Sequence, residues 1–151
     1  MDDLHSFIIQ AKAATYVGNG AHIKSCRLNS HDLEFHHGDY YYLDSYFGGT
    51  DFIGEEVVYY KDQPVWAENY YGKILKPEMI SAAEAGKMLK ASLSMMYTEQ
   101  RFLGAFRHEV DDLIYFDTNE GTYQHFRGLE WIEKNNIRVY ELFYHGGKII
   151  T

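Results

Sequence analysis

Apolar residues recur at helical spacing in two stretches of the chain. The first follows Asp2-Asp3, an acidic pair that suits a helix N-terminus, and ends before Gly18 and Gly20. The second starts at Pro77, which suits a first helical turn because the N–H that proline lacks has no partner there. The two apolar stripes consist of Leu4, Phe7, Ile8, Ala11 and Ala14, and of Ile80, Ala83, Leu89, Leu93 and Met96. These stripes predict helices over 3–15 and 77–96.

Most of the remaining chain is typical of β-strands, because β-branched and aromatic residues alternate there with polar ones. The six clearest strands are predicted over 40–47, 52–60, 64–71, 113–117, 123–133 and 137–145. Three shorter strands are predicted over 21–27, 32–37 and 101–106.

An internal repeat relates the two halves of the chain. Residues 52–74 align without a gap on residues 126–148, and a shift of 73 places 42–45 on 115–118. The identical pairs in the longer match are Phe52/Phe126, Gly54/Gly128, Glu56/Glu130, Val65/Val139, Tyr70/Tyr144 and Gly72/Gly146. The match predicts a duplication. We therefore expect an α+β fold in a single domain (1–151) with two tandem repeats of about 1–75 and 76–151. Each repeat would be a helix plus an antiparallel β-meander, with a cleft between the repeats.

Two hairpin turns sort the strand residues into faces. Asn135-Asn136 suits a type I′ turn because Asn tolerates a positive φ, and the repeat places Lys61-Asp62 at the same position. With these turns as pivots, Val58 would lie opposite Val65. Alternation then gives one face, to be covered by a helix, that holds Phe52, Gly54, Glu56, Val58, Val65, Ala67 and their counterparts. The other face would hold Glu55, Val57, Tyr59, Trp66, Glu68 and Tyr70 in the first half, and Leu129, Trp131, Tyr140, Leu142 and Tyr144 in the second.

The second face is the predicted ligand-binding surface. It is too aromatic to be left open to water, and a large apolar patch usually marks an interface or a groove. Aromatic rings next to a carboxylate attract organic cations. The candidate ligand-binding residues are Glu55, Tyr59, Trp66, Glu68, Tyr70, Trp131, Tyr140 and Tyr144. The alternative interpretation is that this face is a core between two sheets, with Glu55 and Glu68 at its solvated rim.

Glu56 and Glu130 are predicted on the helix-covered face, where a carboxylate needs partners or a raised pKa. Asn69 is a candidate partner for Glu56, and Asp44 completes the predicted buried polar set. One interpretation is a structural hydrogen bond in each repeat. The other is a carboxylate-based hydrolase or isomerase that uses Glu55 or Glu56 with Asp44 as acid and base.

Composition narrows the function classes. Asp plus Glu exceed Lys plus Arg by 22 to 14, and the resulting charge of −8 argues against direct nucleic-acid binding. No apolar run approaches the roughly 20 residues that cross a bilayer. With one cysteine and no signal-peptide pattern at the start, we expect a cytoplasmic protein. His31, His36 and His37 lack metal-ligand spacing, and residues 15–20 follow a helix instead of a strand, so neither a metal nor a cofactor is predicted.

Six short motifs spread over nearly the whole chain resemble those of a family of small bacterial domains of unknown function, whose members occur alone or behind a DNA-binding helix-turn-helix. The motifs are Thr15-Tyr16-Val17-Gly18-Asn19-Gly20, Ser30-His31-Asp32-Leu33, Gly38-Asp39-Tyr40, Phe52-x-Gly54-Glu55-Glu56, Trp66-x-x-Asn69-Tyr70-Tyr71-Gly72 and Tyr144-His145-Gly146-Gly147. The resemblance implies no particular activity and no catalytic residue.

The predicted architecture is also similar in kind to the gyrase-inhibitor-like domains, which contain two copies of a small strand–helix–strand–strand unit. Those domains bind small molecules between the copies. We therefore expect a small-molecule-binding, sensor-like domain with a cationic or aromatic ligand. The alternatives are the carboxylate-based enzyme described above and a protein-interaction or oligomerisation module, for which a homodimer is the simplest form.

Overall fold

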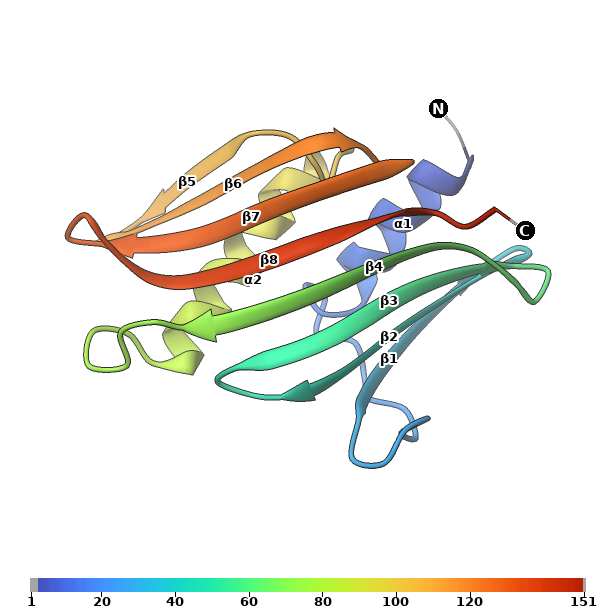
Figure 1. Ribbon diagram of the computed structural model, residues 1–151, viewed down its shortest axis with the longest axis horizontal. Helices are drawn as coiled ribbons and strands as arrows, with labels where there is room; N and C mark the ends of the chain where they lie inside the picture. Colours follow the sequence, from blue (N-terminus) through green and yellow to red (C-terminus); the bar gives the residue numbers. More distant parts are fainter. Residues whose placement is uncertain (1–2, 151) are drawn as a thin grey trace.

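Residues 3–150, which the computed structural model describes, form one antiparallel sheet of eight strands with two helices on one of its faces (Figure 1). The elements in chain order are α1 (Asp3–Ala14), β1 (His31–His37), β2 (Tyr40–Gly48), β3 (Phe52–Tyr60), β4 (Gln63–Ile74), α2 (Ala82–Thr98), β5 (Phe106–Val110), β6 (Leu113–Thr122), β7 (His125–Lys134) and β8 (Ile137–Lys148). The strand order in the sheet is β1-β2-β3-β4-β8-β7-β6-β5. The predicted α+β class and antiparallel sheet are therefore confirmed.

The sheet has the same strand order on either side of its centre. A helix followed by four sequential antiparallel strands occurs twice, and the two sets meet where β4 pairs with β8. In this central ladder Tyr70 lies opposite Tyr144, which is its counterpart in the sequence match. The shared order is what a duplication would produce. That the halves arose by duplication stays a prediction.

Several element boundaries differ from the predicted ones. The helix α2 begins at Ala82 instead of Pro77, because Ser81 and Glu84 form a capping box. In it, Ser81 Oγ accepts a hydrogen bond from the Glu84 N–H at 3.2 Å, and Glu84 Oε2 accepts one from the Ser81 N–H at 2.9 Å. The predicted strand over 21–27 is reduced to one bridge, between Ile23 and Asp32. The strand predicted over 101–106 starts only at Phe106.

The two predicted hairpin turns are correct, but the register next to them is not. Lys61 and Asp62 have φ values of 49° and 64°, and Asn135 and Asn136 have 51° and 61°, as a type I′ turn requires. A β-bulge then displaces the pairing in each hairpin. Val58 lies opposite Trp66 instead of Val65, and Ile132 lies opposite Tyr140 instead of Val139.

The bulges exchange the two faces of β4 and β8, because one extra residue reverses every side chain that follows it. Trp66, Glu68 and Tyr70 therefore lie on the helix-covered face together with Glu56. The rings of Trp66, Tyr42, Tyr115 and Tyr140 are almost completely buried there.

The opposite face of the sheet has no helix over it (Figure 1). Side chains of the central strands are open on this face: Ile53, Tyr71 and Phe143 are 54%, 44% and 55% exposed. Neither helix has the length and apolar character that a membrane span would need.

Candidate functional site

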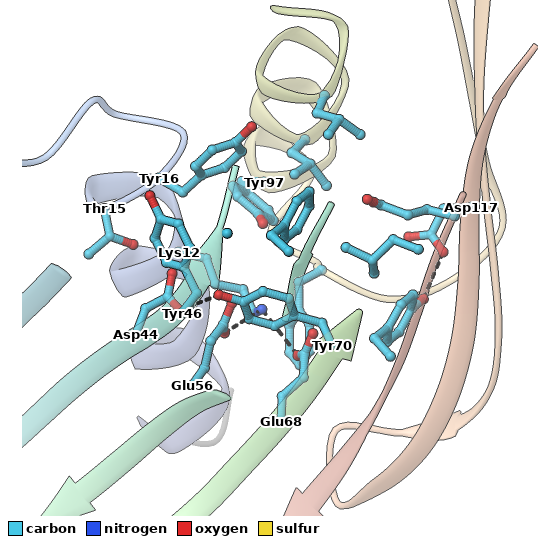
Figure 2. A pocket seen from close by; sticks show the side chains of 18 of the residues that line it. Lys12, Thr15, Tyr16, Asp44, Tyr46, Glu56, Glu68, Tyr70, Tyr97 and Asp117 are labelled. Atoms are coloured by element: carbon cyan, nitrogen blue, oxygen red, sulfur yellow. Dashed lines mark hydrogen bonds and ion pairs between the residues drawn. The ribbon is translucent and has the colours of Figure 1, made fainter. Parts of the chain in front are cut away.

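A cavity of about 230 Å³ lies between the covered face of the sheet and the two helices. Figure 2 shows its side chains converging from α1, from α2 and from strands in both halves of the sheet. Leu89, Leu93 and Tyr97 contribute the wall from α2. The cavity is partly open to solvent. The lining residues that keep some exposure are Tyr16, Tyr46, Gly48, Gly49, Phe52, Tyr70 and Leu93.

Five carboxyl groups face this cavity, and all five are buried. Each comes from a different strand, β2, β3, β4, β6 or β7, and they are Asp44, Glu56, Glu68, Asp117 and Glu130. Their positions follow from the strand register. Asp44 lies opposite Glu56 and Glu56 lies opposite Glu68, so three acids form a row across neighbouring strands. Asp117 lies opposite Glu130 in the same way.

One buried lysine balances part of this negative charge. Lys12 Nζ lies 2.6 Å from Glu56 Oε2 and 3.1 Å from Glu68 Oε2 (Figure 2). The ammonium also lies 5.3 Å from the centre of the Phe102 ring and 5.8 Å from that of Trp66. Burial alone would lower the pKa of Lys12, but the carboxylates of Glu56 and Glu68 more than offset it and raise the pKa well above its usual value. Lys12 therefore stays charged.

Tyrosine hydroxyls donate to the other three acids. Tyr70 donates to Asp44 at 2.6 Å, and its counterpart Tyr144 donates to Asp117 at 2.7 Å. Glu130 accepts from two tyrosine hydroxyls, those of Tyr115 at 2.6 Å and Tyr140 at 3.0 Å.

The glycines of the repeated Gly-x-Glu motif make the tyrosine contacts possible. A Cβ atom on Gly54 would clash with the Tyr70 ring, and one on Gly128 would clash with the Tyr144 ring. Each ring can therefore cross the neighbouring strand and reach its aspartate only because the glycine has no side chain. The two glycines position the hydroxyl donors of the site.

Burial keeps protons on three of the cavity acids into the neutral pH range. It is the main cause that raises the pKa of Asp44 to about 7, that of Glu68 to about 8 and that of Asp117 to about 8. Burial also raises the pKa of Glu130. Groups of this kind can donate or accept a proton near neutral pH, and they gain negative charge when a cation approaches.

The structure brings together part of the predicted site. Glu68, Tyr70, Tyr140 and Tyr144 line the cavity, as do three of the four residues predicted as buried polar groups, which are Asp44, Glu56 and Glu130. The sequence reasoning had placed Glu56 and Glu68 on opposite faces of the sheet. The bulge in β4 is the reason that they meet.

Other predicted residues lie elsewhere. Glu55, Tyr59 and Trp131 are on the uncovered face, because they alternate with inward residues of β3 and β7. Trp66 is fully buried outside the cavity lining, and its Nε1 donates to the backbone oxygen of Tyr123 at 2.8 Å.

The predicted pairing of Asn69 with Glu56 is wrong. Asn69 is exposed and lies opposite Glu55, because the bulge has turned it outward. The partner of Glu56 is Lys12.

Lys12 and Asp117 are the main site residues that the sequence reasoning missed, although a pattern in the sequence indicates each of them. Lys12 follows Leu4 and Ile8 at intervals of four, so it falls on the apolar stripe of α1. Asp117 occupies the position of Asp44 when the chain is shifted by 73. No group of three or more side chains with metal-binding geometry occurs among residues 3–150.

Fold and site together define an α+β domain with an acidic, tyrosine-lined cavity beneath two helices. The family model described as a domain of unknown function, DUF5680, matches residues 44–149. The chain belongs to this family, and the matched segment contains all five cavity acids. No curated protein and no solved structure shows significant similarity to the chain.

Proposed function

We propose that this chain is a small-molecule-binding, sensor-like domain and that its ligand is an organic cation held in the cavity. The observation that carries the proposal is the excess of acidic over basic groups in the cavity. Five buried acids face one buried lysine in a space that is partly open to solvent. Tyrosine rings and leucines line the rest of the space, so an apolar or aromatic body would find contacts there.

Stability alone does not account for such a cluster. Buried charges cost free energy even when they are paired, and well-packed apolar residues of similar volume are often as stable or more stable. Groups with strongly perturbed pKa values in a cleft are typical of functional sites. The cost is understandable if a ligand supplies the missing positive charge.

The two walls of the cavity also differ in a way that suits an amphipathic ligand. The counterpart of Glu68 in the second half is Leu142, and both residues line the cavity. Leu89 and Leu93 of α2 extend the apolar part of the lining. A ligand with one charged end and one apolar end would match this distribution.

The test is a thermal-shift screen of organic cations and their neutral isosteres. A ligand at about 100 times its Kd stabilises a protein by about 2.7 kcal/mol, which raises the Tm of a domain of this size by roughly 5–10 °C. The variant Leu93→Trp should abolish the shift by filling the cavity, whereas Glu55→Gln on the uncovered face should leave it unchanged. The proposal is wrong if no compound binds at millimolar concentration, or if hits bind Leu93→Trp as well as wild type.

In the enzyme alternative, Glu56 and Asp44 remain candidates for the acid and the base. Glu55 does not, because it faces away from the cavity. Glu56 and Asp44 lie opposite each other on β3 and β2, and burial raises the pKa of Asp44 to about 7. Turnover of a hit from the screen, lost in Glu56→Gln, would favour a carboxylate-based hydrolase or isomerase over a sensor.

The uncovered face supports self-association as an additional proposal. Ile53, Tyr71, Phe143 and Leu129 are successive cross-strand neighbours and form an apolar row over the four central strands. Glu55 and Arg127 lie on one side of the row, and Lys73 and Glu141 lie on the other. A second copy, turned by a two-fold axis along the row, would place opposite charges against each other.

Sedimentation velocity tests the homodimer. We expect a dimer for wild type and a monomer for Phe143→Lys, with ligand binding unchanged because the cavity lies on the other face. A wild-type monomer at all accessible concentrations would refute self-association. A different protein would then be the candidate that covers the apolar row.

A further inference from the structure

Each half of the cavity contains a pair of facing acids, but among the described residues only the pair in the first half has a cation between its members. Glu56 and Glu68 lie directly opposite each other on β3 and β4. Asp117 and Glu130 lie directly opposite each other on β6 and β7. Side chains in such pairs have Cβ atoms about 4.5–5.5 Å apart, so one small cation can touch both carboxyl groups.

The first pair shows which cation fits. Lys12 places a primary ammonium between Glu56 and Glu68, at 2.6 and 3.1 Å from one oxygen of each. An ammonium has three N–H donors, so it can serve two carboxylates at the same time. The aromatic rings of Phe102 and Trp66 lie 5.3 and 5.8 Å from the nitrogen and add a cation–π contribution.

The second pair of acids, Asp117 and Glu130, has no such cation between its members in the part of the chain that the structure describes. Asp117 and Glu130 accept hydrogen bonds only from tyrosine hydroxyls, and no lysine or arginine among residues 3–150 forms an ion pair with either. An ionised carboxylate has about four acceptor sites, so both groups retain acceptors for another donor. Both are buried and both line the cavity.

We infer that the ligand carries a primary ammonium group and binds it between Asp117 and Glu130, in the same way that the chain itself holds the ammonium of Lys12 between Glu56 and Glu68. This inference rests on the proposed ligand-binding function. A quaternary ammonium has no N–H to donate to these acids, and a neutral hydroxyl brings no charge.

The cavity also limits the size and character of the rest of the ligand. Its volume of about 230 Å³ is below the roughly 300–1,000 Å³ of pockets that hold drug-sized ligands, so a smaller molecule fits it. Leu142 of β8 lines the cavity where the first half has Glu68, and Leu89 and Leu93 line it from α2. The ligand class is therefore a small primary amine with an apolar body, such as an arylalkylamine.

Three probes with the same phenylethyl body test the inference by calorimetry. They are 2-phenylethylammonium, its N,N,N-trimethyl analogue and the neutral 2-phenylethanol. We expect the primary ammonium to bind wild type about tenfold or more tighter than the other two, because only it supplies both charge and N–H donors. Glu130→Gln should lose most of this preference, whereas Glu55→Gln should keep it.

Carboxyl carbon NMR of wild type locates the ammonium without any variant, which matters if Glu130→Gln folds poorly. The primary amine should shift the side-chain signals of Asp117 and Glu130 more than the signal of Asp44. Larger shifts at Asp44, or equal affinity for the trimethyl analogue, would overturn the inference.

The outcomes separate this inference from the proposed function. If 2-phenylethanol binds as tightly as the amine, and Leu93→Trp blocks both, the cavity is a ligand site but the ammonium assignment is wrong. If none of the three probes binds at millimolar concentration, the ammonium assignment is also wrong. The proposed function fails as well if the wider screen gives no cavity-dependent hit, or if the neutral isosteres bind as tightly as the cations.

Discussion

Replacing Lys12 by methionine tests the electrostatics of the cavity most directly. Methionine preserves much of the apolar stem of the lysine but removes the ammonium that lies 2.6 Å from Glu56 and 3.1 Å from Glu68. Both acids are buried, so neither can be solvated in its place. Removal of one partner from a buried ion pair typically costs about 3–5 kcal/mol, because a charge is left unpaired.

The free energy of unfolding that Lys12→Met loses should be larger at high pH than at low pH. At pH 5.5 a proton on Glu68 removes part of the unpaired negative charge, and each pH unit of proton uptake offsets about 1.4 kcal/mol. Glu68 already has a pKa of about 8, so protonation neutralises it readily. We expect a loss of about 3–5 kcal/mol at pH 8.5 and about 1–2 kcal/mol at pH 5.5.

Urea unfolding followed by tryptophan fluorescence measures both values. With an m-value of about 2 kcal/mol/M, the midpoint should fall by roughly 1.5–2.5 M at pH 8.5 and by less than 1 M at pH 5.5. Lys87→Met, at an exposed position of α2, is the matched control and should change little at either pH. An equal loss at both pH values, or a loss below about 1 kcal/mol at pH 8.5, would refute the electrostatic account.

Three further predictions follow from the same contacts. Glu56→Gln should be more stable than Glu56→Ala by about 1–3 kcal/mol in urea unfolding, because Gln keeps an acceptor near Lys12; equal midpoints would contradict this. Wild-type stability should fall as pH rises from 5 to 7, since Asp44, Glu68 and Asp117 keep protons in the folded protein that they lose near pH 4 when unfolded. One such group gives about 1.4 kcal/mol per pH unit, and a Tm that is constant or rises over this range would contradict the raised pKa values. The variant Lys12→Ala should be restabilised by propylammonium, which replaces the deleted part of the side chain, but not by tetramethylammonium; equal effects of the two salts would show a general salt effect.

The sequence was most informative where each residue follows its local pattern. The strand β3 runs from Phe52 to Tyr60 as predicted, and its alternation places Glu56 inward and Glu55 outward without interruption. The turn at Asn135-Asn136 was also predictable, because few residues tolerate a positive φ. In these cases a few residues that are adjacent in the sequence determine the direction of the side chain or the type of turn.

The β4 face was not predictable by alternation, because the bulge after Val58 depends on packing between strands. Val65 and Trp66 are both apolar, so the sequence does not show which of them should enter the core. In the structure Trp66 is fully buried and Val65 is the residue without a direct partner in the ladder. One unpaired residue was enough to separate Glu68 from Glu56 in the predicted faces, although the two share Lys12 in the fold.

The same displacement explains why aromatic rings and carboxylates come together on a different surface from the predicted one. They meet beneath the helices, where Asp117 and Glu130 line the cavity and Glu55 does not. Their negative charge has to be neutralised by something as long as they stay buried. Lys12 supplies one positive charge between Glu56 and Glu68, and protons neutralise part of the remaining charge. A bound cation would lower the pKa of Asp117 and displace its proton, because charge and proton compete for the same carboxylate. In the proposed function, ligand binding and protonation would therefore be alternative ways of stabilising one cavity.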